Sequence, residues 1–155
     1  MQIRKVFEIL TFFEKGQLRR FDDFVHSPYF NKHEQVCSLW NYIKAYLSSE
    51  TALSKLLPEA IYKSIMPEEA YDARRLNHLY SYLQELLTKF LAIEGILNNK
   101  PLPIELEAIK ELRKLSPLSK HLRALLRKHQ QKLGASAYRN ASYYYNKFEL
   151  HKELD

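Results

Sequence analysis

The fold of this chain is decided by residues 72–98, which read DARRLNHLYSYLQELLTKFLAIEGILN. Apolar residues recur there at alternating steps of three and four, which places them on one side of an α-helix about 40 Å long. This apolar stripe comprises Leu76, Leu79, Leu83, Leu86, Phe90, Ile93 and Leu97. A second set widens it beyond a coiled-coil seam and comprises Tyr80, Tyr82, Leu87, Leu91 and Ile96. We therefore expect a multi-helix bundle around one long central helix, with Asp72 as its N-terminal cap.

The composition indicates an all-α protein. The 155 residues include 3 Gly and 6 Pro, and Val occurs only at positions 6, 25 and 36, whereas Leu, Lys, Glu and Ala are abundant. Few turn residues and few β-branched residues argue against an all-β fold. A chain of this length can bury the core of one domain, or form one domain and the beginning of another.

Four shorter helices are predicted ahead of the central one. Their approximate ranges are 3–13, 17–26, 32–47 and 58–65. Gly16 is expected to end the first as a C-terminal glycine, and Pro58 suits the first turn of the fourth. Asn31 is predicted to cap the third helix, with Glu34 completing a capping box and Phe30 stapling onto the new helix.

Residues 98–103, NNKPLP, are predicted to close the central helix and to separate two domains. These are an N-terminal bundle over residues 1–98 and a helical extension over residues 99–155. The extension is expected to hold helices over 104–115, from Ser116 and Pro117 to Gly134, and over 137–154. It could begin a helical repeat, although no fixed period establishes one.

The last predicted helix carries an aromatic stripe that runs to the chain end. Its members are Tyr138, Ala141, Tyr144 or Tyr145, Phe148 and Leu154. Three consecutive tyrosines at 143–145 cannot all face one side of a helix, and no stop signal follows Glu153. We therefore expect a truncated protein or a helix that awaits a partner, either another protein or the C-terminal part of its own chain.

Three segments carry a family resemblance. FVHSPYFNK at 24–32, AYDARRL at 70–76 and LLTKFL at 86–91 resemble the N-terminal pattern of a family of uncharacterised all-helical bacterial proteins. The resemblance covers roughly residues 5–95 and is most specific around the Ser-Pro-Tyr-Phe-Asn-Lys run. It implies an N-terminal module of a longer protein and carries no activity with it.

Excess positive charge is confined to residues 110–132, which hold eight Lys or Arg and one acid within a chain of net charge +6. Two adjacent helices could gather this charge into a patch for an anionic partner such as nucleic acid. The patch would comprise Lys110, Arg113, Lys114, Lys120, Arg123, Arg127 and Lys128. The alternative is a solvated helix face, because no nucleic-acid motif is present and no aromatic residue interrupts the run to stack a base.

Aromatic residues in the Ser-Pro-Tyr-Phe-Asn-Lys run form a second candidate site. Tyr29 and Phe30 could anchor a partner from a loop. The competing interpretation is structural, in which both side chains fix the angle between two helices.

No catalytic or metal site is predicted, and we expect neither a cofactor nor an enzymatic activity. His129 lies on an apolar helix face, where a buried histidine bonded to a neighbouring helix is favoured over a metal ligand or a pH-sensitive contact. The other histidines show no metal-ligand spacing with Cys37 or with paired acids, and no phosphate loop or nucleophile motif is found.

The sequence also predicts a cytoplasmic protein without a membrane span, because it has one cysteine and no signal peptide. Our first functional expectation is a protein-interaction or scaffold module. The alternative is a nucleic-acid-binding module that uses residues 110–132. The sequence sets neither the partner nor the oligomeric state.

Overall fold

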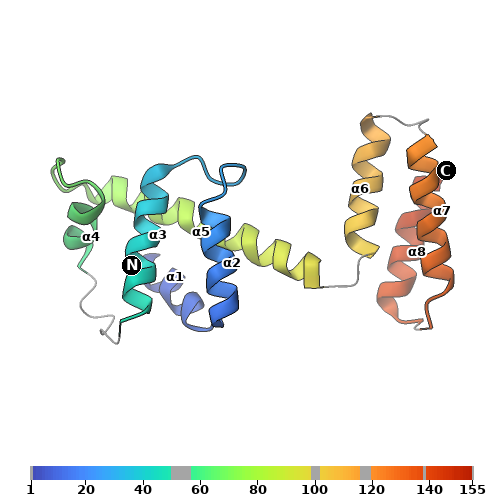
Figure 1. Ribbon diagram of the computed structural model, residues 1–155, viewed down its shortest axis with the longest axis horizontal. Coiled ribbons are helices and arrows are strands. Elements are labelled where there is room, and N and C mark those ends of the chain that lie inside the picture. The colour runs from blue at the N-terminus through green and yellow to red at the C-terminus, as the bar shows by residue number, and fades with distance from the viewer. Residues whose placement is uncertain (1, 50–56, 99–101, 116–119, 138, 155) are drawn as a thin grey trace. The chain divides into compact units, whose positions relative to one another are not determined.

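The computed structural model describes residues 2–49, 57–98, 102–115, 120–137 and 139–154, and these form eight helices without a strand (Figure 1). The helices are α1 Gln2–Thr11, α2 Lys15–Val25, α3 Glu34–Leu47, α4 Pro58–Ile65, α5 Ala73–Asn98, α6 Leu102–Leu115, α7 Lys120–Gly134 and α8 Ala141–Leu154. The predicted all-α fold is confirmed. Tyr138, Ser116, Pro117 and residues 99–101 of the predicted 98–103 boundary lie outside the described residues.

The chain divides into two compact units, residues 1–92 and 93–155. We expected a division after residue 98, whereas this one falls inside α5. Charge is shared unequally between the units. Residues 93–155 hold twelve Lys or Arg against seven acids, and residues 1–92 hold twelve against eleven.

The long helix α5 begins where the sequence places it. Asp72 caps it, because Oδ1 of its carboxylate accepts hydrogen bonds from the main-chain N–H groups of Arg74, at 2.9 Å, and Arg75, at 3.1 Å. Its apolar stripe is buried from Leu76 to Phe90, and the helix is unbroken over 26 residues.

The width and the end of this stripe differ from our prediction. Of the residues expected to widen it, Tyr80 and Leu87 are buried. The prediction was wrong for the others, since Tyr82, Leu91, Ile96 and, from the stripe itself, Leu97 are all exposed. A stripe spaced at threes and fours turns slowly around a straight helix, so one set of neighbours cannot cover its whole length.

Aromatic side chains form the centre of the first unit. The ring of Phe21 packs edge-on against that of Trp40, with centroids 4.7 Å apart, and also contacts Phe90 of α5 at 5.2 Å. Phe24 contacts the same Phe90 ring at 5.7 Å. The phenylalanine-rich helix α2 is therefore covered by α3 and α5, which supply the apolar area that a short helical hairpin lacks.

Two predicted helix signals act differently in the structure. Gly16 does not end the first helix, because α1 stops at Thr11 and Gly16 lies inside α2. The N-terminus of α2 is fixed instead by Glu14, whose main-chain N–H donates to Gln17 Oε1 at 3.3 Å. Asn31 is not the N-cap of α3, since that position belongs to His33.

The second unit is built on three helices, α6, α7 and α8, which lie side by side (Figure 1). Its core consists of Leu106, Ile109, Leu122, Leu126, Leu133, Tyr143 and Leu150, with Leu112 and Leu125 packed at the edge. His129 is buried on the same face of α7 as three of these leucines. Each helix thus turns one stripe toward a shared interior.

The described residues of the aromatic stripe predicted for the last helix lie outside the core of the second unit. Tyr143 and Leu150 are the buried apolar residues of this helix, whereas Tyr144, Tyr145 and Phe148 are exposed. Asn140 sets the start of the helix, because its Oδ1 accepts a hydrogen bond from the N–H of Tyr143 at 3.0 Å. The core selects residues 143 and 150, seven positions and close to two turns apart, as its contacts.

Candidate interaction surfaces

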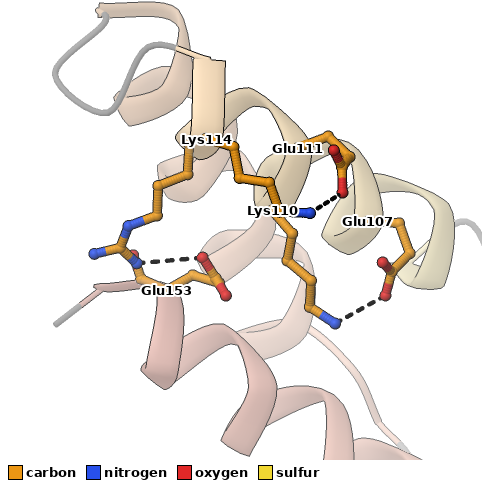
Figure 2. A pocket seen from close by; sticks show the side chains of 6 residues that line it. Glu107, Lys110, Glu111, Lys114 and Glu153 are labelled. Carbon is orange, nitrogen blue, oxygen red and sulfur yellow. Dashed lines mark hydrogen bonds and ion pairs between the residues drawn. The ribbon is translucent and has the colours of Figure 1, made fainter.

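Ion pairs fill the seam between α6 and α8. Lys110 Nζ lies 2.8 Å from Glu107 Oε1 and 3.1 Å from Glu149 Oε2 (Figure 2 shows the first pair). Hydrogen bonds to Glu107 and Glu149 raise the pKa of Lys110. The hydrogen bond from Lys152, and then that from Lys110, lowers the pKa of Glu149. Lys110 therefore contributes a structural bridge between two helices.

Arg113 extends the same seam to the end of α8. Its guanidinium donates to the main-chain carbonyl of Lys152 at 3.3 Å and to that of Glu153, and lies 3.2 Å from the Glu153 carboxylate. A cation at this position satisfies carbonyl groups that a helix C-terminus leaves without partners. Lys114 pairs with Glu111 one turn away on α6.

These residues line an open depression on the second unit (Figure 2). The lining residues are Glu107, Lys110, Glu111, Arg113, Lys114 and Glu153, three acids and three bases. Because acid and base pair with each other here, an anion would have to displace a carboxylate before it could bind. Lys110, Arg113 and Lys114 are thus placed in a neutral seam.

The remaining four residues of the predicted patch lie on α7. Lys120, Arg123, Arg127 and Lys128 are exposed, and within the described residues none of them forms an ion pair. The helix contains no acid. Arg123 and Arg127 are four residues apart and therefore lie on the same side of α7. Lys128 lies nearer Glu105, and the positive charge of Lys128 helps to lower the pKa of Glu105. The structure therefore divides the seven predicted residues into a paired group and an exposed group.

His129 joins α7 to α6. Its side chain is 1 % exposed, and its Nδ1 lies 2.5 Å from Glu105 Oε2. The other carboxylate oxygen of Glu105 accepts a hydrogen bond from Lys132. Burial raises the pKa of Glu105, but the Lys132 bond and the nearby charges outweigh it, so the pKa lies below its ordinary value. His129 is thus a buried side chain that contacts a carboxylate of the neighbouring helix.

An exposed aromatic surface covers the side of α8 that faces away from the core. Its residues are Tyr144, Tyr145 and Phe148, which are 59 %, 63 % and 60 % exposed. We call it the α8 aromatic face. The ammonium of Lys152 lies 4.7 Å from the centre of the Phe148 ring, which is a cation–π contact, and it also pairs with Glu149 at 2.8 Å. The consecutive tyrosines signalled that some rings must be exposed, but the sequence did not show which.

The Ser-Pro-Tyr-Phe-Asn-Lys turn separates its two candidate residues. Phe30 stacks on Phe24, with ring centroids 4.3 Å apart, and so belongs to the packing of the first unit. Tyr29 is 84 % exposed and touches Phe30 edge-on. Of the two, Tyr29 alone presents its ring fully to solvent.

Within the described residues, no cluster of three His, Cys, Asp or Glu side chains could hold a metal ion. Over the same residues, no helix combines the length and hydrophobicity that a membrane span needs. Comparison of the chain with protein-family models, with curated proteins and with solved structures finds no match.

Proposed function

We propose that the chain is a non-enzymatic interaction module that binds a protein partner through the α8 aromatic face. The observation that carries this proposal is that α8 is apolar on two opposite sides. Tyr143 and Leu150 face the core of the second unit, while Tyr144, Tyr145 and Phe148 face outward. An apolar patch on the outer side of a helix whose inner side already packs on a core is typical of a surface that contacts another protein.

The size of the face supports the same proposal. Three aromatic side chains exposed by about three fifths present roughly 350 Å² of surface, which is in the range of functional apolar patches on small proteins. Tyrosine and phenylalanine lose little rotamer freedom when they are covered, and aromatic residues are common energetic centres of interfaces.

The charged residues of the second unit have structural roles that fit a binding module. Glu149, Glu153 and Glu105 each link two helices through ion pairs. Their charge is used to hold α6, α7 and α8 together. We propose this role in place of acid–base catalysis.

A photo-crosslinking experiment tests the proposal. A photoreactive phenylalanine analogue at position 144 is expected to form one discrete adduct with another protein in cells that express the chain, and Phe148→Glu should abolish it. The matched control places the analogue at Phe12, which is exposed on the first unit and should give no adduct. Equal labelling from both positions, or persistence of the adduct in Phe148→Glu, would show that the face is not the contact surface.

A second candidate function is nucleic-acid binding by α7. The specific observation in its favour is that Lys120, Arg123, Arg127 and Lys128 are exposed on a helix without acids. A salt titration against oligonucleotides separates this candidate from the first, because phosphate binding weakens steeply with salt.

We further propose that the chain acts in the cytoplasm and is the N-terminal module of a longer helical protein. The first proposal is supported by the single Cys37, which cannot form an internal disulfide. The second proposal rests on the resemblance of the segments at 24–32, 70–76 and 86–91 to the N-terminal pattern of the family of all-helical bacterial proteins.

A further inference from the structure

We infer that the outer seam between α7 and α8 binds single-stranded nucleic acid, with phosphates on the basic side chains of both helices and a base stacked on Tyr144. This inference rests on the second candidate function. It adds the α8 side of the site and the form of the nucleic acid. It follows from the sides of the two helices that the ion pairs of the second unit leave exposed.

The second unit has three seams between its helices, and acids neutralise two of them. Lys110 and Arg113 of α6 pair with acids of α8. Glu105 of α6 contacts His129 and pairs with Lys132 of α7. These contacts fix which sides of α7 and α8 face α6. The flanks opposite to them therefore border the line where α7 meets α8.

The third seam is lined by basic, polar and aromatic side chains. Each helix contributes a row of residues at steps of three and four on its flank away from α6, and every member of the two rows is exposed. We call this surface the α7–α8 seam, and it comprises Arg123, Arg127, Gln130, Tyr144, Lys147 and His151.

No acid among the described residues competes for the cations of this seam. Over those residues, Arg123, Arg127 and Lys147 form no ion pair. Positions three and four residues away from each of them on the same helix hold no Asp or Glu. Lys152 is not counted here, because it pairs with Glu149. An anion can therefore bind the seam without displacing a carboxylate, which the depression between α6 and α8 does not allow.

The side chains of the seam suit a nucleic-acid strand. A guanidinium group matches two oxygens of a phosphate with parallel hydrogen bonds, and the seam has two such groups. Residues 135–140 connect α7 to α8, so the helices run in opposite directions and Arg127 lies near the level of Lys147. The cations of the two helices thus face each other across a line that a phosphate backbone can follow.

Tyr144 supplies the aromatic ring that the basic run 110–132 lacks. It is the member of the α8 aromatic face nearest α7, one helical turn from Lys147, and it is exposed. Stacking on such a ring requires an unpaired base, which selects a single strand over a duplex. An acidic peptide supplies charge without a base to stack, and a bilayer presents a plane where the seam offers a line.

Fluorescence anisotropy of the full chain with a labelled single strand of about 16 nucleotides tests the inference. The strand should bind more tightly than its duplex, with an affinity that falls steeply with salt. Lys147→Glu should weaken binding at low salt about tenfold and lower the salt slope by about one. Tyr144→Ala should weaken it at least about fivefold, because a stacked base loses its platform.

Matched controls separate the seam from general charge and folding effects. Lys114→Glu makes the same charge change on α6 in the same unit, and Tyr29→Ala removes an exposed ring of the first unit. Both should keep the parent affinity. Helical circular dichroism should be unchanged in all four variants, and Lys147→Gln should show a smaller loss of affinity in the same direction as Lys147→Glu.

The outcomes distinguish the inference from the candidate function on which it rests. Binding that Arg123→Glu/Arg127→Glu removes but Lys147→Glu and Tyr144→Ala leave intact would overturn the α7–α8 seam and keep α7 as the surface. Equal or tighter binding of the duplex would overturn the single strand alone. Absence of binding to either form at low salt would overturn both. Polyglutamate, or vesicles of phosphatidylcholine and phosphatidylserine, that bind as tightly as the strand would overturn nucleic acid as the occupant.

Discussion

The side-chain amide of Asn31 donates a hydrogen bond to the main-chain carbonyl of Val25, 2.8 Å away, and so closes the turn between α2 and α3 from inside. The same side chain accepts a hydrogen bond from the N–H of His33 at 2.9 Å and donates to Cys37 Sγ at 3.2 Å. Asn31 is buried, and it therefore connects the end of one helix with the beginning of the next.

Asn31→Ala is expected to lower the free energy of unfolding of the first unit by about 1–3 kcal/mol, because buried main-chain groups lose their partner. Denaturant unfolding followed by the fluorescence of Trp40, the single tryptophan, measures this. The control is Asn41→Ala at an exposed position of α3, which should change stability by less than about 0.5 kcal/mol. Equal effects of the two variants would contradict the role of Asn31.

Asp22 makes the stability of the first unit depend on pH. Its carboxylate accepts hydrogen bonds from Trp40 Nε1 at 2.7 Å and from Lys44 Nζ at 2.6 Å. Burial raises the pKa of Asp22, but these two bonds outweigh it and hold the pKa below the ordinary value of 3.8. A folded-state pKa below the unfolded value gives stability that is full above the unfolded pKa and is lost as pH falls through the folded one.

Unfolding of the parent chain and of Asp22→Asn, followed between about pH 7 and pH 3, tests this dependence. The parent should lose part of its stability below about pH 4, and Asp22→Asn should lose less over that range while starting lower at neutral pH. Asp23→Asn, the exposed neighbour, is the control and should follow the parent. Parallel curves for the parent and Asp22→Asn would refute the assignment.

Glu105 is expected to contribute to the stability of the second unit through His129 and Lys132. Glu105→Ala removes the carboxylate that contacts the buried His129 ring and pairs with Lys132, so it should lower stability by about 1–3 kcal/mol. Hydrogen exchange of the main-chain amides of α6 and α7 measures this loss of stability. Tryptophan fluorescence does not report on it, because Trp40 lies in the first unit. Glu107→Ala removes an exposed acid from the same helix and should cost less than about 1 kcal/mol.

Tyr80 carries a buried hydroxyl that finds no hydrogen-bond partner among the described residues. Burial raises the pKa of Tyr80, so the hydroxyl stays neutral. Tyr80→Phe removes a desolvated polar group without opening a cavity and is expected to preserve stability or to raise it by up to about 1 kcal/mol. Tyr62→Phe is the contrasting variant, because the Tyr62 hydroxyl donates a hydrogen bond to Glu69 at 3.3 Å. Denaturant unfolding followed by Trp40 fluorescence should show a loss of stability in Tyr62→Phe and none in Tyr80→Phe.

Substitution of Arg123 and Arg127 tests whether α7 binds nucleic acid. If α7 binds phosphate, fluorescence anisotropy with short single-stranded and duplex oligonucleotides should show binding that weakens with salt. Arg123→Glu/Arg127→Glu should then reduce affinity at low salt by about tenfold or more and lower the salt slope by about two.

The matched control for that titration is Lys63→Glu/Lys89→Glu, an identical charge change at exposed positions of the first unit. It should leave most of the binding intact. Absence of binding at low salt, or equal losses in the two double variants, would exclude α7 as a specific phosphate-binding surface.

Local signals in the sequence determined the extent of α4 and the start of α5. Pro58 and the residues that follow predicted α4 with the bounds that the structure has, and Asp72 predicted the start of α5. A proline in a first turn and a carboxylate at a cap act within three residues of their own position. The spacing of Leu76 to Phe90 likewise identified a buried helix, because periodicity along a helix is a local property.

Only the tertiary structure decided how the side chains of the candidate sites are used. The spacing of 110–132 placed Lys110 and Arg113 in a free basic patch, whereas Glu149 and Glu153 neutralise them from about forty residues further along the chain. The polar side chain of Asn31 could have capped α3, but in the folded chain its amide donates a hydrogen bond to the carbonyl of Val25 instead. In α8, Tyr143 is buried in the core of the second unit, whereas Tyr144 is exposed. The sequence alone could not predict these contacts. In each case a side chain has several possible partners, and only the folded chain brings one of them close.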